Sequence, residues 1–149
     1  MRTLLFSIIL FSMMDISNAQ SKKFNFNKDH DAIEVSDLEA SARFYKEVLG
    51  LKEIPNGGLP EHIRWFELND KVQIHLIESE SLPEKQKGVH MALNTNKLQE
   101  FMDFLNSKDT HFENWPGEAG KTNTRPDGVK QIYLQDPDGY WIEVNDGSL

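Results

Sequence analysis

The stretch DHDAIEVSDLEASARFYKEVLGL, residues 29–51, indicates a strand that leads directly into a helix. In HDAIEV, residues His30–Val35, aliphatic and polar side chains alternate, as is typical of a strand with one buried face. Ser36 opens a Ser-x-x-Glu capping box, and apolar residues then recur at helical spacing from about residue 37 to residue 49. Gly50 suits the left-handed position that ends many helices. The stretch therefore predicts a β-α unit with a defined start and end.

Three more strands are expected after this helix. Apolar and polar residues alternate again in three short segments, at 51–54, 62–68 and 72–78. Asn69-Asp70 is the expected turn between the last two segments, which would make them a hairpin. The first half of the chain is therefore predicted to be β-α-β-β-β.

The second half repeats this order. A strand is predicted at 89–94, followed by a helix that Asn96 and Gln99 can cap. Further strands are predicted at 111–115, 129–135 and 140–145, and the turn DPDG at Asp136 to Gly139 joins the last two. The Gly- and Pro-rich segment 116–128 is long for a plain connection and is typical of a binding loop. Two such halves predict one α+β domain, built from module one at residues 29–79 and module two at residues 88–146.

The first residues have the pattern of a secretory signal peptide. Arg2 precedes a continuous apolar run, which is too short to span a bilayer of about 30 Å. Small residues then stand where a signal peptidase reads the chain, so cleavage is expected before Gln20. We therefore expect a signal peptide at residues 1–19 and an N-terminal extension at 20–28. The mature protein is expected to be periplasmic or extracellular, with no membrane attachment after cleavage.

Composition excludes several classes of function. The formal net charge of the 149 residues is −8, which argues against a nucleic-acid partner because phosphate binding needs clustered Lys and Arg. The chain has no cysteine, so a thiolate zinc site and a cysteine nucleophile are both excluded. Any metal must therefore be held by imidazole and carboxylate groups.

Four chemistry-bearing side chains share one feature of the predicted strands. Each stands on the face opposite the aliphatic residues of its strand, and the four occupy matching strands of the two halves: His30, His75, His90 and Glu143. If the polar faces of both sheets meet, three imidazoles and one carboxylate point at one place. This ligand set suits one divalent ion of Zn, Ni, Fe, Mn or Co, which can polarise a small oxygenated substrate.

Three further residues are candidates for substrate binding. If Asn69-Asp70 is a two-residue turn, Arg64 faces His75 and Phe66 faces Gln73, so Arg64 would anchor an anionic substrate group beside the metal and Phe66 would line the same pocket. Trp141 would supply an aromatic wall. The alternative is that Arg64 is an ordinary surface residue and that Trp141 packs in the core.

These motifs resemble the vicinal-oxygen-chelate superfamily, which includes glyoxalase I, bleomycin resistance proteins, extradiol dioxygenases and fosfomycin-resistance enzymes. Residues 29–51 look like the family's opening strand and helix, GVHMALNT like its second opening strand, and QDPDGYWIEVND like its closing hairpin. The resemblance implies two βαβββ modules with curved mixed sheets that form a metal-binding concavity. It also implies that His30, His75, His90 and Glu143 are the ligands, and that Glu143 is the catalytic base.

Two departures from glyoxalase I affect the expected reaction. His75 replaces a carboxylate, and Glu34 stands where that enzyme has an arginine for the glutathione carboxylates. We therefore expect metal-dependent lyase or isomerase chemistry that does not use glutathione. One alternative is a non-haem iron dioxygenase or an epoxide-opening resistance enzyme that uses His30, His90 and Glu143. Another is a protein that binds and sequesters small molecules without catalysis. Relatives close their site either within one chain or across a homodimer, and the resemblance leaves both arrangements open.

Overall fold

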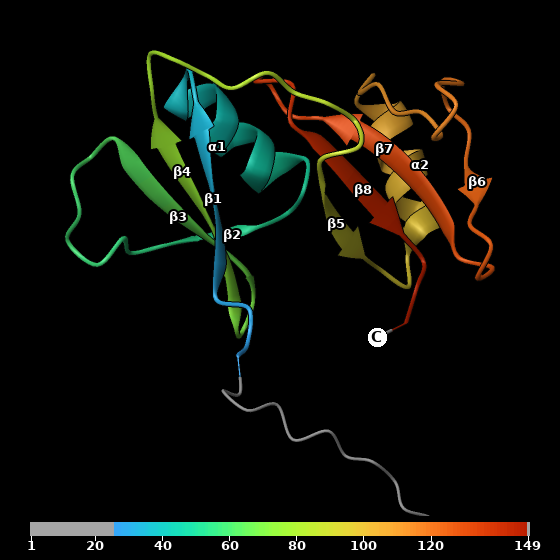
Figure 1. The fold of residues 1–149 in the computed structure, drawn as a ribbon, viewed down its shortest axis with the longest axis horizontal. Coiled ribbons are helices and arrows are strands. Elements are labelled where there is room, and N and C mark those ends of the chain that lie inside the picture. Colours follow the sequence, from blue (N-terminus) through green and yellow to red (C-terminus); the bar gives the residue numbers. More distant parts are fainter. Residues whose placement is uncertain (1–25, 149) are drawn as a thin grey trace, which may run out of the picture.

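The computed structural model describes residues 26–148. The expected signal peptide at 1–19 and most of the expected extension at 20–28 lie outside these residues. Two four-stranded sheets stand side by side, each with one helix packed on one face (Figure 1). The sheets are curved and do not close into a barrel. Between residues 26 and 148, no helix is long and apolar enough to cross a membrane.

Module one has the predicted β-α-β-β-β order. Its elements are β1 (His30–Val35), α1 (Leu38–Glu47), β2 (Lys52–Ile54), β3 (Ile63–Asn69) and β4 (Val72–Glu78). The spatial order is β1-β4-β3-β2, in which β1 runs parallel to β4 and the other pairs are antiparallel. Strand β1 is therefore an edge strand, and β4 lies inside the sheet.

Module two repeats this topology. Its elements are β5 (His90–Asn94), α2 (Leu98–Ser107), β6 (Asn123–Thr124), β7 (Lys130–Gln135) and β8 (Trp141–Asn145). The spatial order β5-β8-β7-β6 matches that of module one, with β5 parallel to β8. The predicted strand at 111–115 forms only isolated bridges through Glu113, and β6 lies instead inside the predicted loop. The prediction of two α+β modules is thus confirmed, with one strand misplaced.

The helix starts differ from the predicted caps. Asp37 is the N-cap of α1, and its carboxylate accepts a hydrogen bond from the Ala40 amide at 2.9 Å. Ser36 instead donates its hydroxyl to Asp138 of module two, so the predicted capping box is wrong. Helix α2 begins after Lys97, which makes no side-chain cap. The predicted helix end is correct, since Gly50 has a φ of +69°.

The two modules share one continuous packing interface. Each has its own buried cluster between helix and sheet, and Phe44, Leu49 and Met91 pack against both clusters. A hydrogen bond also joins the modules: the buried Tyr45 hydroxyl donates to Asp136 Oδ2 in the DPDG turn at 3.1 Å. Burial raises the pKa of Asp136 above its usual value. The DPDG turn therefore anchors module two to helix α1.

Candidate metal centre

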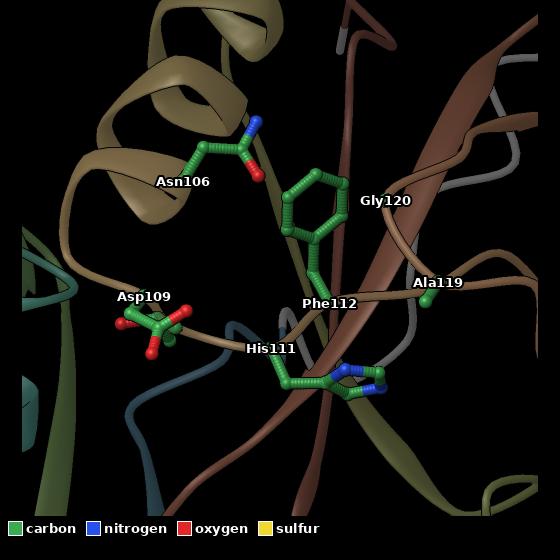
Figure 2. Close-up of a pocket in the computed structure, with 7 residues that line it drawn as sticks. Asn106, Asp109, His111, Phe112, Ala119 and Gly120 are labelled. Carbon is green, nitrogen blue, oxygen red and sulfur yellow. The ribbon is translucent and has the colours of Figure 1, made fainter.

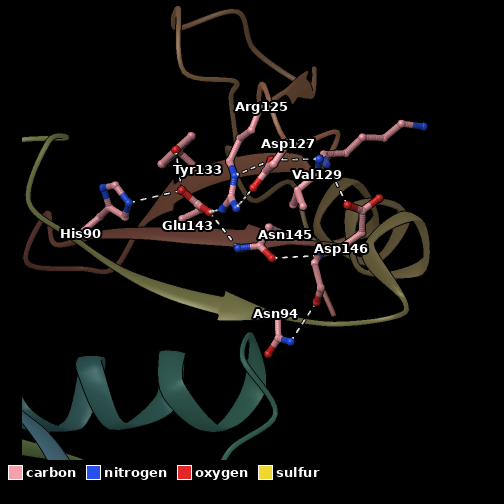
Figure 3. Close-up of polar contacts among 11 residues, drawn as sticks. His90, Asn94, Arg125, Asp127, Val129, Tyr133, Glu143, Asn145 and Asp146 are labelled. Carbon is pink, nitrogen blue, oxygen red and sulfur yellow. Dashed lines mark hydrogen bonds and ion pairs between the residues drawn. The ribbon is translucent and has the colours of Figure 1, made fainter. Parts of the chain in front are cut away.

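His90 and Glu143 form a close pair on module two. They lie on the neighbouring strands β5 and β8, and His90 Nε2 is 3.3 Å from Glu143 Oε2 (Figure 3). Only 5% of the Glu143 side chain is exposed, whereas 22% of the His90 side chain is. His90 and Trp141 also line a hollow of about 220 Å³ that is shared with residues of β1. The pair is thus reachable from one side and buried on the other.

The orientation of His90 suits metal ligation. Its Nδ1 lies 2.8 Å from the Lys87 carbonyl oxygen, which accepts only if Nδ1 carries the proton. In the neutral imidazole, the Nε2 lone pair then faces the Glu143 carboxylate. Two donors that bind one ion at about 2.1 Å lie about 3.0–3.4 Å apart at tetrahedral or octahedral angles. The observed 3.3 Å between Nε2 and Oε2 therefore fits a shared divalent ion.

Glu143 is held by donors on both of its oxygens. The Tyr133 hydroxyl donates to Oε2 at 2.6 Å, and the side-chain Nδ2 of Asn145 donates to Oε1 at 2.8 Å. Arg125 Nη1 also reaches Oε1, at 3.3 Å (Figure 3). Burial and the Glu143 hydrogen bond raise the pKa of Tyr133 well above its usual value. The carboxylate is therefore fixed in position.

Sequence reasoning missed Tyr133 and Arg125. Tyr133 pairs directly with Glu143 across β7 and β8. The register of the hairpin closed by the DPDG turn could have identified it, as cross-strand partners follow from the turn. Arg125 lies in the predicted loop 116–128 and gives no such signal, because its position depends on the path of that loop.

The backbone of Lys87 contacts His90, and its side-chain ammonium contacts a carboxylate, a carbonyl and two aromatic rings. Its ammonium donates to Glu113 Oε1 at 2.7 Å and to the Asn114 carbonyl at 2.6 Å. It also lies 4.8 Å from the ring centroids of both Tyr133 and Trp141. The hydrogen bond from Lys87 lowers the pKa of Glu113. The contacts of the Lys87 side chain thus hold its backbone in place, and the backbone carbonyl orients His90. Trp141 lies next to the Lys87 ammonium.

The two predicted ligands of module one also form a pair, but with a different geometry. The rings of His30 and His75 are stacked, with centroids 4.2 Å apart and planes 12° apart. His30 Nδ1 lies 2.6 Å from Asp29 Oδ2, and His75 Nε2 lies 2.9 Å from Gln73 Oε1. Burial, followed by the proximity of His30, lowers the pKa of His75.

The four predicted ligands are brought together in pairs and not as one set. In residues 26–148 of a single chain, no group of three or more His, Cys, Asp or Glu side chains is placed to hold a metal ion. Each module therefore carries half of the predicted site, and one chain does not bring the halves together.

The predicted roles of Arg64 and Phe66 rested on a hairpin register that is wrong by one residue. The turn lies at residues 70–71, and a bulge near residue 68 shifts the strands, so Trp65 is the residue opposite His75. Phe66 is fully buried in the core. Arg64 lies on the helix side, where its guanidinium binds Glu53 through two hydrogen bonds of 2.7 and 2.8 Å. The structure thus places neither side chain on the face of His75.

A separate hollow of about 240 Å³ lies at the end of α2 (Figure 2). It contains His111, whose side chain is 67% exposed and whose Nε2 lies 3.1 Å from Glu113 Oε2. None of the four predicted ligands lines this hollow. His111 and Glu113 thus form a second histidine–glutamate contact, in which the histidine is exposed and not buried.

Comparison with known proteins assigns the chain to a family. Residues 28–144 match the model of the Glyoxalase/Bleomycin resistance protein/Dioxygenase superfamily, and the chain belongs to this superfamily. An uncharacterized protein YwbC of Bacillus subtilis (strain 168) is 33% identical over 122 residues, which cover 77% of this chain and 93% of the relative. The metallothiol transferase FosB of Staphylococcus saprophyticus is 28% identical over 132 residues, 81% of this chain and 77% of the relative.

Solved structures show the same fold. Oxidase ChaP-H2 superposes with a TM-score of 0.69 at 21% identity, over 83% of this chain and 95% of that structure. The fosfomycin resistance protein FosX of Mesorhizobium loti superposes with a TM-score of 0.61 at 17% identity, over 84% of this chain and 94% of that structure. Members of the superfamily typically bind a divalent metal, often act on small molecules and often form dimers.

Proposed function

We propose that the chain is a divalent-metal-dependent enzyme whose ligands are His90 and Glu143 of one copy and His30 of a second copy. The observation that carries this proposal is the His90–Glu143 pair, with Nε2 and Oε2 3.3 Å apart. His30 has the same orientation pattern as His90, since its Nδ1 contacts an oxygen and leaves Nε2 open. The ion would be Zn, Ni, Fe, Mn or Co, as imidazole and carboxylate ligands suit all five.

A second copy is proposed because the half-sites of one chain do not meet within residues 26–148. Apolar side chains beside the His90 half-site are open to contact a partner: Val89 is 78% exposed and Trp115 is 49% exposed. The third ligand, His30, begins an edge strand with 41% of its side chain exposed. A symmetric dimer would thus complete two identical sites from four half-sites.

The residues around the pair favour a small anionic, oxygenated substrate. A bound divalent ion would polarise a substrate oxygen. Arg125 is 37% exposed, and its guanidinium has more N–H donors than its contacts with Asp127 and Glu143 use. Trp115 and Trp141 offer apolar surface beside the Lys87 ammonium, whose charge is paired with Glu113. The site can therefore orient a small anion by its charge and its apolar part.

The fixed position of Glu143 favours a ligand role over that of a mobile base. A glyoxalase-type lyase or isomerase would need this carboxylate to take up and return a proton. Here Tyr133 and Asn145 hold its two oxygens, and Arg125 adds a third donor. We therefore favour addition of a nucleophile to an activated substrate over isomerisation. The name of the relative from Staphylococcus saprophyticus, metallothiol transferase, agrees with this class of reaction.

Metal content tests the proposal. Purified protein, reconstituted with Mn²⁺ or Zn²⁺ and dialysed, should hold about one ion per chain by elemental analysis. His90→Ala and Glu143→Gln should each lose it. His111→Ala is the matched control, because it removes an exposed histidine that also faces a glutamate. Wild-type protein that holds no metal, or His90→Ala that holds as much as wild type, would contradict the proposal. Metal retention with iron and substrate-dependent O₂ consumption would instead identify a dioxygenase.

A further inference from the structure

Three aromatic rings form one stack across module one. His75 lies between the other two: its ring is 4.2 Å from that of His30 at 12°, and 4.3 Å from that of Trp65 at 6°. The three residues come from the adjacent strands β1, β4 and β3. The stack therefore runs from the edge strand, which carries the proposed ligand His30, to the interior of the sheet.

We propose that His75 is a positioning residue, which holds the His30 ring by stacking, and that Trp65 supports it from behind. This inference rests on the proposed function, in which His30 is a metal ligand. It gives His75 a new role, because the position of His75 on the polar face of β4 had predicted that it is a ligand.

Ring geometry argues against shared ligation by the two histidines. An imidazole binds a metal through a lone pair that lies in the ring plane, at about 2.0–2.1 Å. The planes of His30 and His75 are almost parallel and their centroids are 4.2 Å apart. An ion between them would lie about 2 Å out of each plane, as far as the length of the bond itself. His75 Nε2 is moreover engaged with Gln73 Oε1.

His30 needs such support because of its place in the fold. It is the first residue of the edge strand β1, and its polar partner Asp29 is 88% exposed. A contact as exposed as this one constrains the ring only weakly, since water competes for both groups. A ring stacked on its face restricts the His30 ring to one plane, which keeps Nε2 directed away from the strand.

Trp65 is in turn held in place by the loop that precedes β3. Gly57 lies against its ring, since a Cβ at this position would be 3.4 Å from Cη2. Asn56 fixes this loop by donating to the Leu59 and Ile63 carbonyls at 3.0 and 2.9 Å. Trp65 Nε1 is buried with no hydrogen-bond partner among the described residues. The residue thus contributes its ring face and not its donor, so Phe should replace it.

Paired variants test the stack in the metal-free protein. Nuclear magnetic resonance should show the His30 ring protons shifted upfield by the neighbouring ring. His75→Phe should keep this shift, whereas His75→Ala should lose it. Trp65→Phe should keep more of this shift than Trp65→Ala does. Cooperative thermal unfolding of each variant shows that the fold is intact. An unchanged His30 spectrum in His75→Ala would overturn the inference, whether or not the protein binds metal.

Titration with Mn²⁺ then separates positioning from ligation. His75→Phe should bind within about threefold of wild type, and His75→Ala about tenfold more weakly, as for the loss of other groups that orient ligands. If His75→Phe loses binding as completely as His30→Ala does, His75 is a ligand and the inference is wrong. If wild-type protein binds no metal, the proposed function fails, and the His30 spectra alone decide whether His75 orients His30.

Discussion

Replacement of Tyr133 by Phe tests the buried polar network around Glu143. The change removes one hydroxyl, which donates to Glu143 Oε2 at 2.6 Å, and leaves the ring in place. The ring contact with His90, at 5.3 Å between centroids, should therefore persist. Any change in metal binding then reports on the hydrogen bond and not on the packing.

The size of the effect follows from the charge and burial of the acceptor. A hydrogen bond to a charged group contributes about 1.5–3 kcal/mol to folding stability, and the 5% exposure of Glu143 favours the upper half of that range. Loss of a group that orients a metal ligand typically weakens metal binding about 10- to 100-fold. We expect Tyr133→Phe to lower the free energy of unfolding by about 2.5 kcal/mol, measured in urea. We expect it to weaken Mn²⁺ binding at least tenfold, measured by calorimetry.

Tyr45→Phe is the matched control. It also removes a buried tyrosine hydroxyl that donates to a carboxylate, but that carboxylate is Asp136 at the module contact. It should lower stability by a comparable amount and leave Mn²⁺ affinity unchanged. Equal losses of affinity in both variants would contradict a specific role for the Tyr133 hydroxyl, because they would show that the effect follows from global destabilisation. Full affinity in Tyr133→Phe would refute it as well.

The remaining predictions concern other parts of the chain. The Arg64 hydrogen bond lowers the pKa of Glu53, so the stability from this pair is present above pH 4.5 and decreases as the pH falls through the lowered value. Glu53→Gln should therefore flatten the dependence of unfolding free energy on pH below pH 4.5, and an unchanged dependence would contradict this. Lys87→Met should weaken Mn²⁺ binding about tenfold by freeing the backbone that orients His90, and unaltered affinity would exclude that role. Protein recovered from a secreting host should begin at Gln20, and an intact N-terminus would contradict the signal-peptide prediction.

Strand alternation predicted the faces of the sheets well because burial is decided locally. Once the aliphatic side chains of a strand pack under a helix, the alternate side chains must point the other way. Ile74, Leu76 and Ile142 are fully buried and Val144 is 5% exposed, and the polar residues between them lie on the opposite face. The faces of His75 and Glu143 could therefore be predicted from the sequence.

Register and helix caps were less predictable because they depend on small differences between competing turns. The side chain of Asn69 accepts hydrogen bonds from the amides of residues 71 and 72, which moves the turn one position along the chain and adds a bulge. At α1, Ser36 and Asp37 are both good cap residues, and a contact with Asp138 engages Ser36. The turn is therefore decided by a local side-chain contact, and the cap by a contact distant in sequence.

The convergence of the ligands was beyond prediction for a different reason. Periodicity places a side chain on a face of its own sheet, but it does not determine how two sheets are arranged in space. The pairs His30–His75 and His90–Glu143 follow from strand neighbours within each module. Whether ligands from both pairs meet at one ion depends on how the modules are arranged, and in our proposal on a second chain.

A mixed dimer tests whether the metal site is shared between two copies of the chain. Chains that carry His30→Ala and chains that carry Glu143→Gln can be co-expressed with different affinity tags, and the mixed dimer purified on both tags. We expect each variant alone to bind no metal, and the mixed dimer to regain about half of the wild-type content, because one of its two sites is intact. A mixed dimer without metal, beside a wild-type protein that binds it, would contradict a site shared between two copies.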